Sequence, residues 1–108
     1  MSDEDSSPED LPGQSIPPGA ISRELPIINK RGLHARASAK FVQMVERFDA
    51  EVWVTKGNET VGGNSIMGLM MLSAGPGTSI LVRATGAQAA EAIEALDVLV
   101  SSRFGEMD

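Results

Sequence analysis

The residue whose chemistry stands out is His34, the single histidine of the chain. It follows a turn at Gly32 and precedes a stretch with helical spacing, so it lies where a helix is expected to begin. Backbone N–H groups at a helix start lack intrahelical partners and carry the positive end of the helix dipole, which favours a bound anion. Arg36 can hold two oxygens of a phosphate at once. These groups suit reversible phosphorylation of an imidazole nitrogen, with amides and Arg36 holding the charged oxygens.

The same residues permit plainer interpretations. A lone histidine at a helix start is often a surface residue or a hydrogen-bond partner, and basic residues beside a glycine turn, here Lys30 and Arg31, are usually just solvated. A small enzyme with His34 as general base is a further alternative. No Asp or Glu lies between Glu24 and Glu46, so a carboxylate that orients the ring would have to come from elsewhere in the chain.

Composition removes several classes of site. The chain of 108 residues has no cysteine, which excludes disulfides, thiol nucleophiles and thiolate metal sites. One histidine is too few for a two-histidine metal site within one chain, and no metal or other cofactor is expected. Residues 1–20 carry five acids and no base, which leaves ten acids and nine bases for residues 21–108. The remainder is nearly neutral, so nucleic-acid binding is not expected.

The beginning of the chain differs in composition from the rest. Four of the six prolines and few large apolar residues lie in the first 20 positions, which predicts a disordered acidic tail over residues 1–21. No basic region followed by an apolar core is present there, so no signal peptide is predicted. The uncharged stretch 60–82 contains five glycines and Pro76, and it is not a membrane span. We therefore expect a cytoplasmic protein with one domain over residues 22–106.

Periodicity within this domain predicts the elements that must position His34. Alternation and β-branched residues indicate strands at 24–29, 51–56, 59–62 and 79–84. Apolar residues at helical spacing indicate helices at 35–48, 66–72 and from 86 to about 104. The order βαββαβα, with a tight turn at 57–58, is typical of an α+β fold. The expected architecture is an open-faced sandwich, with a four-stranded antiparallel sheet and three helices on one face.

A second segment, around Ser65, combines a polar start with apolar residues that the core does not need. Ser65 is a good N-cap for the 66–72 helix. Leu69 and Leu72 fill the one face that such a short helix can bury. The apolar residues left for the surface are Ile66, Met67 and Met70. Methionines at this spacing are more often core residues, but exposed ones beside an active site would form an adaptable docking patch.

Both segments resemble one family. The stretch Gly32-Leu-His-Ala-Arg-Ala-Ser-Ala-Lys-Phe-Val42 resembles the active-site signature of HPr, the histidine-containing phosphocarrier family of the bacterial phosphotransferase system. The stretch Asn64-Ser-Ile-Met-Gly-Leu-Met70 resembles the regulatory-serine region of the same family. The spacing between them and the order of elements also agree. The resemblance covers about residues 22–106 and leaves the acidic tail outside.

The resemblance implies a role for each of these residues. It implies that His34 accepts a phosphoryl group on its δ nitrogen, that Arg36 assists, and that the protein is a monomeric carrier and not an enzyme. The implied donor is enzyme I, charged from phosphoenolpyruvate, and the implied acceptor is a histidine of an A-type enzyme II domain. The resemblance also places the 66–72 helix in the docking surface. It implies that Ser65 can be phosphorylated by an HPr kinase/phosphorylase, as a regulatory site.

Two questions stay open at this point. The carrier could serve sugar transport or a purely regulatory pathway, and the sequence does not decide between them. An adaptor that docks through the same face without phosphorylation is a rival interpretation. The presence of both His34 and Arg36 favours the carrier.

Overall fold

The computed structural model describes residues 16–106. The elements follow in the order β1 (Ile21–Pro26), α1 (Ala35–Val45), β2 (Glu51–Lys56), β3 (Glu59–Gly62), α2 (Ile66–Met71), β4 (Ser79–Thr85), α3 (Ala89–Ser101) and the short 3-10 turn η3 (Arg103–Gly105). The predicted βαββαβα order is confirmed. No helix within residues 16–106 is long and apolar enough to cross a membrane.

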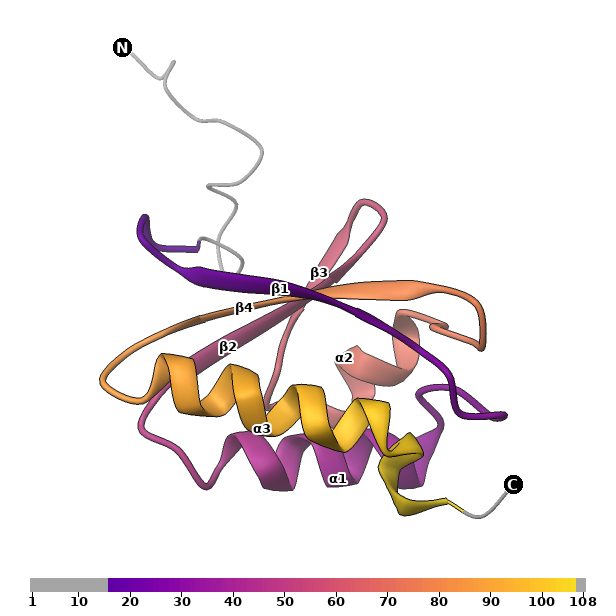
Figure 1. Ribbon diagram of the computed structural model, residues 1–108. Coiled ribbons are helices and arrows are strands. Elements are labelled where there is room, and N and C mark those ends of the chain that lie inside the picture. Colours follow the sequence, from indigo (N-terminus) through magenta and orange to yellow (C-terminus); the bar gives the residue numbers. More distant parts are fainter. Residues whose placement is uncertain (1–15, 107–108) are drawn as a thin grey trace, which may run out of the picture.

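The strands form one antiparallel sheet in the order β1-β4-β2-β3. The β2–β3 hairpin turns at Gly57, whose φ of 61° lies in the left-handed region that glycine adopts without steric penalty. Figure 1 shows α1, α2 and α3 together on one side of the sheet, and no helix among residues 16–106 lies on the other side. This is the open-faced sandwich that the sequence predicts.

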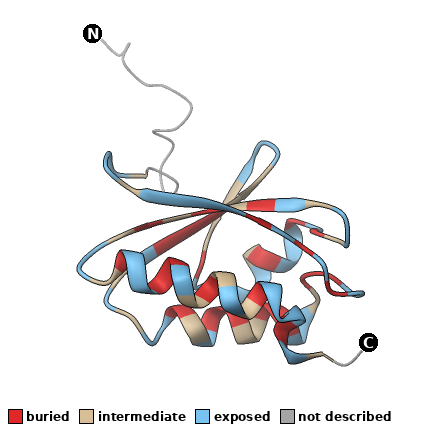
Figure 2. Cartoon of the chain, in the orientation of Figure 1, coloured by how far each residue is buried: buried red, intermediate tan, exposed pale blue. Residues whose placement is uncertain are grey.

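The core lies between the sheet and the helices. In β4, Ile80, Val82 and Ala84 are fully buried, because alternate residues of a strand point to the same face. Phe41 of α1 and Leu96 of α3 are also fully buried. Figure 2 shows buried residues on the helix sides that face the sheet. Burial of each large apolar side chain stabilises the fold by about 1.5–3 kcal/mol, so this layer fixes the position of α1.

The first strand differs from its predicted range of 24–29, because it begins at Ile21 and ends at Pro26. Its first four residues are exposed and show no apolar alternation, but they pair with β4 from Ile21–Ala84 onward. Burial alternates beyond the strand as far as Asn29, although the ladder ends at the Pro26–Ser79 pair. Ile21, predicted as the last residue of the tail, is therefore a strand residue; residues 1–15 of that predicted tail lie outside the described residues.

Helix ends also differ from the prediction. The first helix ends at Val45 and the last at Ser101, instead of near residues 48 and 104. After α3, the φ angles of Arg103 and Phe104 are 60° and 56°, a conformation that residues with a Cβ rarely adopt. Phe104 is nevertheless buried to 1% exposure, so the chain turns back and places this ring in the core. We call residues 102–106 the C-terminal turn.

An ion cluster ties α3 to the edge strand β1. Arg23 donates to Asp97 at 2.8 Å and to Glu94 at 3.1 Å. The hydrogen bond to Asp97, followed by that to Glu94, raises the pKa of the Arg23 guanidinium. The side chains are exposed, so water and salt screen these pairs.

Candidate functional site

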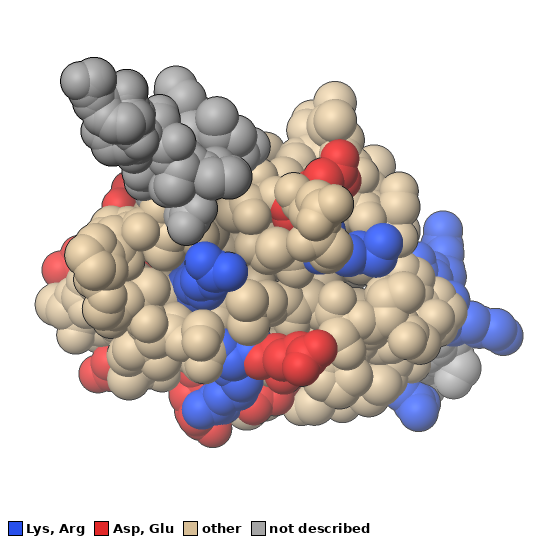
Figure 3. Space-filling view, turned by 90° about the horizontal axis from the view of Figure 1, so that it is seen from above, with Lys and Arg blue, Asp and Glu red and all other residues tan. Residues whose placement is uncertain are grey.

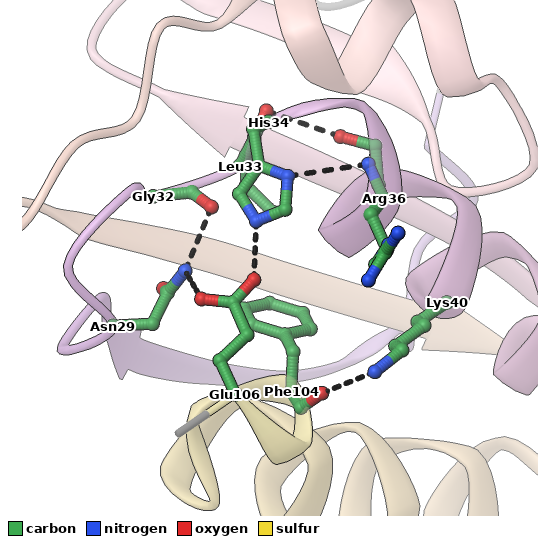
Figure 4. A network of polar contacts seen from close by, with 9 residues as sticks. Asn29, Gly32, Leu33, His34, Arg36, Lys40, Phe104 and Glu106 are labelled. Atoms are coloured by element: carbon green, nitrogen blue, oxygen red, sulfur yellow. Dashed lines mark hydrogen bonds and ion pairs between the residues drawn. The ribbon is translucent and has the colours of Figure 1, made fainter. Parts of the chain in front are cut away.

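His34 is the N-cap of α1, as its sequence position predicts. Its backbone is extended, with φ −75° and ψ −178°, and its carbonyl oxygen accepts the first helical hydrogen bond from Ser38 N–H at 2.8 Å. The ring itself acts as the cap, because Nδ1 accepts a hydrogen bond from Arg36 N–H at 3.2 Å. Figure 4 shows Nδ1 turned toward the start of the helix. One ring nitrogen is therefore directed at the amides of the first helical turn, the positive end of the dipole.

The loop before His34 depends on Gly32. Its φ is +66°, and a Cβ on this residue would lie 2.2 Å from the carbonyl oxygen of Ala74. That same carbonyl accepts a hydrogen bond from Leu33 N–H at 3.0 Å. Leu33 is 5% exposed and anchors the loop in the core. Glycine thus allows the His34 loop to lie directly against the segment that follows α2.

The other ring nitrogen of His34 contacts a carboxylate from the far end of the chain. Nε2 is hydrogen-bonded to Oε2 of Glu106, and the two side chains are only 17% and 16% exposed. Asn29, fully buried, donates from Nδ2 to Oε1 of Glu106 at 3.1 Å and to the carbonyl of Gly32 at 2.9 Å. Figure 4 shows the carboxylate between the carboxamide and the imidazole. The sequence search around His34 missed both Asn29 and Glu106.

The C-terminal turn delivers this carboxylate. Gly105 has a φ of 74° and continues the left-handed conformation of the two residues before it. Lys40 of α1 donates from Nζ to the carbonyl oxygen of Phe104 at 2.6 Å, while the Phe104 ring is buried. The Lys40 hydrogen bond and the buried ring both hold the turn in place, and Glu106 is its last residue.

Three basic residues lie close to His34 in the chain. Lys30, Arg31 and Arg36 are all exposed, and Figure 4 shows Arg36 on the Nδ1 side of the ring. Figure 3 shows Lys and Arg atoms without neighbouring acidic ones at the end of the molecule at which the loop after β1 lies in Figure 1, whereas nearer the middle Lys and Arg lie among Asp and Glu. Such a concentration of positive charge attracts phosphate groups. Within residues 16–106, no group of three or more His, Asp or Glu side chains could hold a metal ion.

The second predicted segment lies on α2, which packs against α1. Ser65 is the N-cap, and its Oγ accepts a hydrogen bond from Gly68 N–H at 2.9 Å. Leu69 and Leu72 are buried as predicted. The exposed fractions of the three residues predicted for the surface are 41% for Ile66, 69% for Met67 and 39% for Met70. We call these three the α2 patch; Met71 beside them is 68% exposed and was not predicted.

The chain is similar to known proteins over most of its length. Residues 21–102 match a family model described as the PTS HPr component phosphorylation site. The phosphocarrier protein HPr of Neisseria meningitidis serogroup A is 54% identical over 86 residues, which are 80% of this chain and 97% of that protein. The solved structure of HPr-C-His from Thermoanaerobacter tengcongensis is 42% identical, with a TM-score of 0.77, and the match covers 82% of this chain and 99% of that one.

A second solved structure bears on assembly. An HPr dimer from the same organism is 45% identical, with a TM-score of 0.64, over 76% of this chain and 94% of that one. The family match includes His34 and the α2 patch, whereas the C-terminal turn extends beyond residue 102, where the match ends.

Proposed function

The chain belongs to the HPr phosphocarrier family of the phosphotransferase system, and on that premise we propose that His34 accepts a phosphoryl group on Nδ1 from enzyme I. The group then passes to a histidine of an A-type enzyme II domain. In this proposal the protein is a monomeric, cytoplasmic carrier and does not turn over a substrate by itself.

The observation that carries the proposal is the hydrogen bond from Arg36 N–H to Nδ1 at 3.2 Å. It directs the lone pair of Nδ1 toward a group of backbone donors. The lone pair attacks phosphorus, a new N–P bond forms, and the donor's bond to phosphorus breaks with its electron pair staying on the donor. The amides of the first turn and the Arg36 guanidinium then hold the charged phosphoryl oxygens.

The α2 patch supports a docking role next to this nitrogen. The segment after α2 is hydrogen-bonded to the His34 loop, because Leu33 N–H donates to the Ala74 carbonyl, and α2 packs against α1. In this proposal the patch and His34 form one docking surface. Methionine side chains are flexible and polarizable, and they suit a surface that must fit more than one partner. Enzyme I and the enzyme II domain would dock here in turn.

Ser65 is the proposed regulatory site, phosphorylated by an HPr kinase/phosphorylase. Its side chain is half-buried at the start of α2, directly before Ile66 and Met67. A phosphate there would face the amides of the helix start, which tolerate negative charge. It would also add a charge beside the α2 patch, and burial of the patch against a partner would then require desolvation of that charge.

The contact between Glu106 and His34 favours one competing function, a small enzyme with His34 as general base. A carboxylate that orients an imidazole is typical of such enzymes, and the sequence around His34 lacks one. The carrier, the enzyme and the non-phosphorylated adaptor differ in one measurable property, which is the uptake of phosphate by the protein itself.

The test is incubation of the full chain with enzyme I and radiolabelled phosphoenolpyruvate. We expect one acid-labile phosphate per chain and none in His34→Ala. Ser65→Ala is the matched control and should still be labelled, because the label is not on serine. Absence of label in the wild-type chain, or label in His34→Ala, would overturn the proposal.

A further inference from the structure

We infer that Glu106 is a positioning residue for phosphoryl transfer, holding the proton of the neutral imidazole on Nε2 and leaving Nδ1 as the nitrogen with a lone pair. The inference rests on the proposed function of His34, because it explains which nitrogen of that ring can attack. Glu106 touches neither phosphorus nor the donor and acts through His34.

The hydrogen bonds around the ring define the tautomer. A backbone N–H can only donate, so the bond from Arg36 N–H requires an unprotonated Nδ1. A carboxylate can only accept, so the contact with Oε2 of Glu106 requires a proton on Nε2. Both requirements are met by one neutral form of the ring. The same form has its lone pair where the phosphoryl group is proposed to bind.

Asn29 makes the carboxylate a fixed partner. It is fully buried, and its Nδ2 donates to Oε1 of Glu106, so the second oxygen is left for His34. Both the Glu106 and the His34 side chains are more than four-fifths shielded from solvent. A hydrogen bond to a charged group is stronger in such surroundings than between exposed side chains.

The carboxylate also lies in the right place for the charge that develops during transfer. When Nδ1 forms its bond to phosphorus, the imidazole becomes positively charged while the proton stays on Nε2. Glu106 faces that proton, so its negative charge stabilises the charged ring. Nδ1 stays open to the donor, because Glu106 contacts the other nitrogen. Residues that orient a reactive imidazole through its second nitrogen have this double effect in unrelated sites.

The substitution Glu106→Gln tests this sharply because Asn29 predicts how the new carboxamide will lie. The Gly32 carbonyl holds Nδ2 of Asn29 in place, and the second hydrogen of that nitrogen points to Glu106. It should therefore bind the glutamine oxygen and leave the glutamine NH₂ facing Nε2 of His34. An NH₂ group donates, so it favours the tautomer with the proton on Nδ1. Since the chain has one histidine, ¹⁵N NMR of the histidine-labelled protein reads the protonation of both ring nitrogens without assignment.

The expected result has two parts. On the high-pH plateau of the ring signals, wild-type protein should carry its proton on Nε2, and Glu106→Gln should shift the equilibrium toward Nδ1–H. Phosphate uptake from enzyme I should fall at least about tenfold in Glu106→Gln. The control Glu59→Gln removes the same charge from the exposed start of β3 and should change neither quantity.

Other outcomes would overturn the inference. An unchanged tautomer in Glu106→Gln would exclude the positioning role, whatever the rate of uptake. Glu106→Asp keeps the carboxylate and should retain part of the Nε2–H preference. An equal loss in both variants would assign the effect to packing. If wild-type protein took up no phosphate, the proposed function would fail, while the tautomer comparison would still decide the role of Glu106.

Discussion

Lys40 and Phe104 are joined by a hydrogen bond of 2.6 Å, from Nζ in α1 to the carbonyl oxygen in the C-terminal turn. The helix that His34 caps therefore also holds the segment that returns to His34. Phe104 has a φ of 56°, in the left-handed region. This conformation costs about 1–3 kcal/mol for a residue with a side chain, and it persists only where the surrounding structure fixes it. Burial of the Phe104 ring supplies the other constraint.

Lys40→Met should loosen the C-terminal turn while keeping most of the apolar stem of the side chain. We expect faster hydrogen exchange at the amides of residues 104–106, and phosphate uptake lowered about two- to fivefold, less than the loss in Glu106→Gln. Lys56→Met, at the end of β2, is the matched control. Unchanged exchange in Lys40→Met would show that the buried ring alone holds the turn.

Gly32→Ala should destabilise the protein and displace the His34 loop. A matched control exists at Gly57, whose φ of +61° is close to the +66° of Gly32 but whose Cβ would meet nothing within 4 Å. Gly57→Ala should cost about 1–2 kcal/mol from the left-handed backbone alone. Gly32→Ala should cost more, because its Cβ would also clash with the Ala74 carbonyl. Urea denaturation of both variants measures the difference, and equal losses would contradict the close approach.

Two substitutions at Ser65 separate its cap from its proposed regulation. Ser65→Ala removes the acceptor of Gly68 N–H and should lower the free energy of unfolding by about 1 kcal/mol. Ser65→Asp can still cap the helix, so its stability should change by less than about 1 kcal/mol. It should nevertheless slow His34 phosphorylation by enzyme I, because it adds charge beside the α2 patch. An unchanged rate in Ser65→Asp would remove this helix from the docking surface.

Met67→Gln tests the α2 patch directly. The side chain is 69% exposed, so the free energy of unfolding should change by less than about 0.5 kcal/mol. Loss of an apolar docking contact should raise the KM for phosphate transfer from enzyme I, measured by the initial rate of labelling. Met71→Gln, at 68% exposure on the same helix, shows how far the docking surface extends. An unaltered KM in both variants would place the partner elsewhere.

Much of the fold can be predicted because its signals are local. The apolar spacing around Phe41 predicts α1, and alternation in 51–56 with a glycine turn predicts the β2–β3 hairpin. The start of β1 cannot be predicted this way, since Ile21 to Glu24 are exposed and are a strand only because β4 lies alongside. The position of His34 at a helix start is likewise local, and that prediction is confirmed.

The missed part of the site is not local. Glu106 is 72 positions from His34, and its approach depends on a turn that contradicts the helical spacing of Val100 and Phe104. Gly105 is the sequence signal that could have predicted the end of the helix, because glycine is common just after a helix. Asn29 continues the burial alternation of Leu25 and Ile27, so its pattern predicts a strand residue and does not reveal its contact with Glu106.

The contact between Asn29 and Glu106 has a consequence for the order in which the site forms during synthesis. The ribosome releases β1 early. In the sheet order β1-β4-β2-β3, this strand pairs with β4, so its partner is absent until residues 79–85 have been synthesised. Contacts between distant segments form late in folding. Asn29 meets Glu106 across 77 positions, so the His34 ring receives its second partner only after residue 106 has been synthesised. A nascent or clipped chain that stops before Glu106 can present the histidine, but not the oriented nitrogen that phosphoryl transfer is proposed to need.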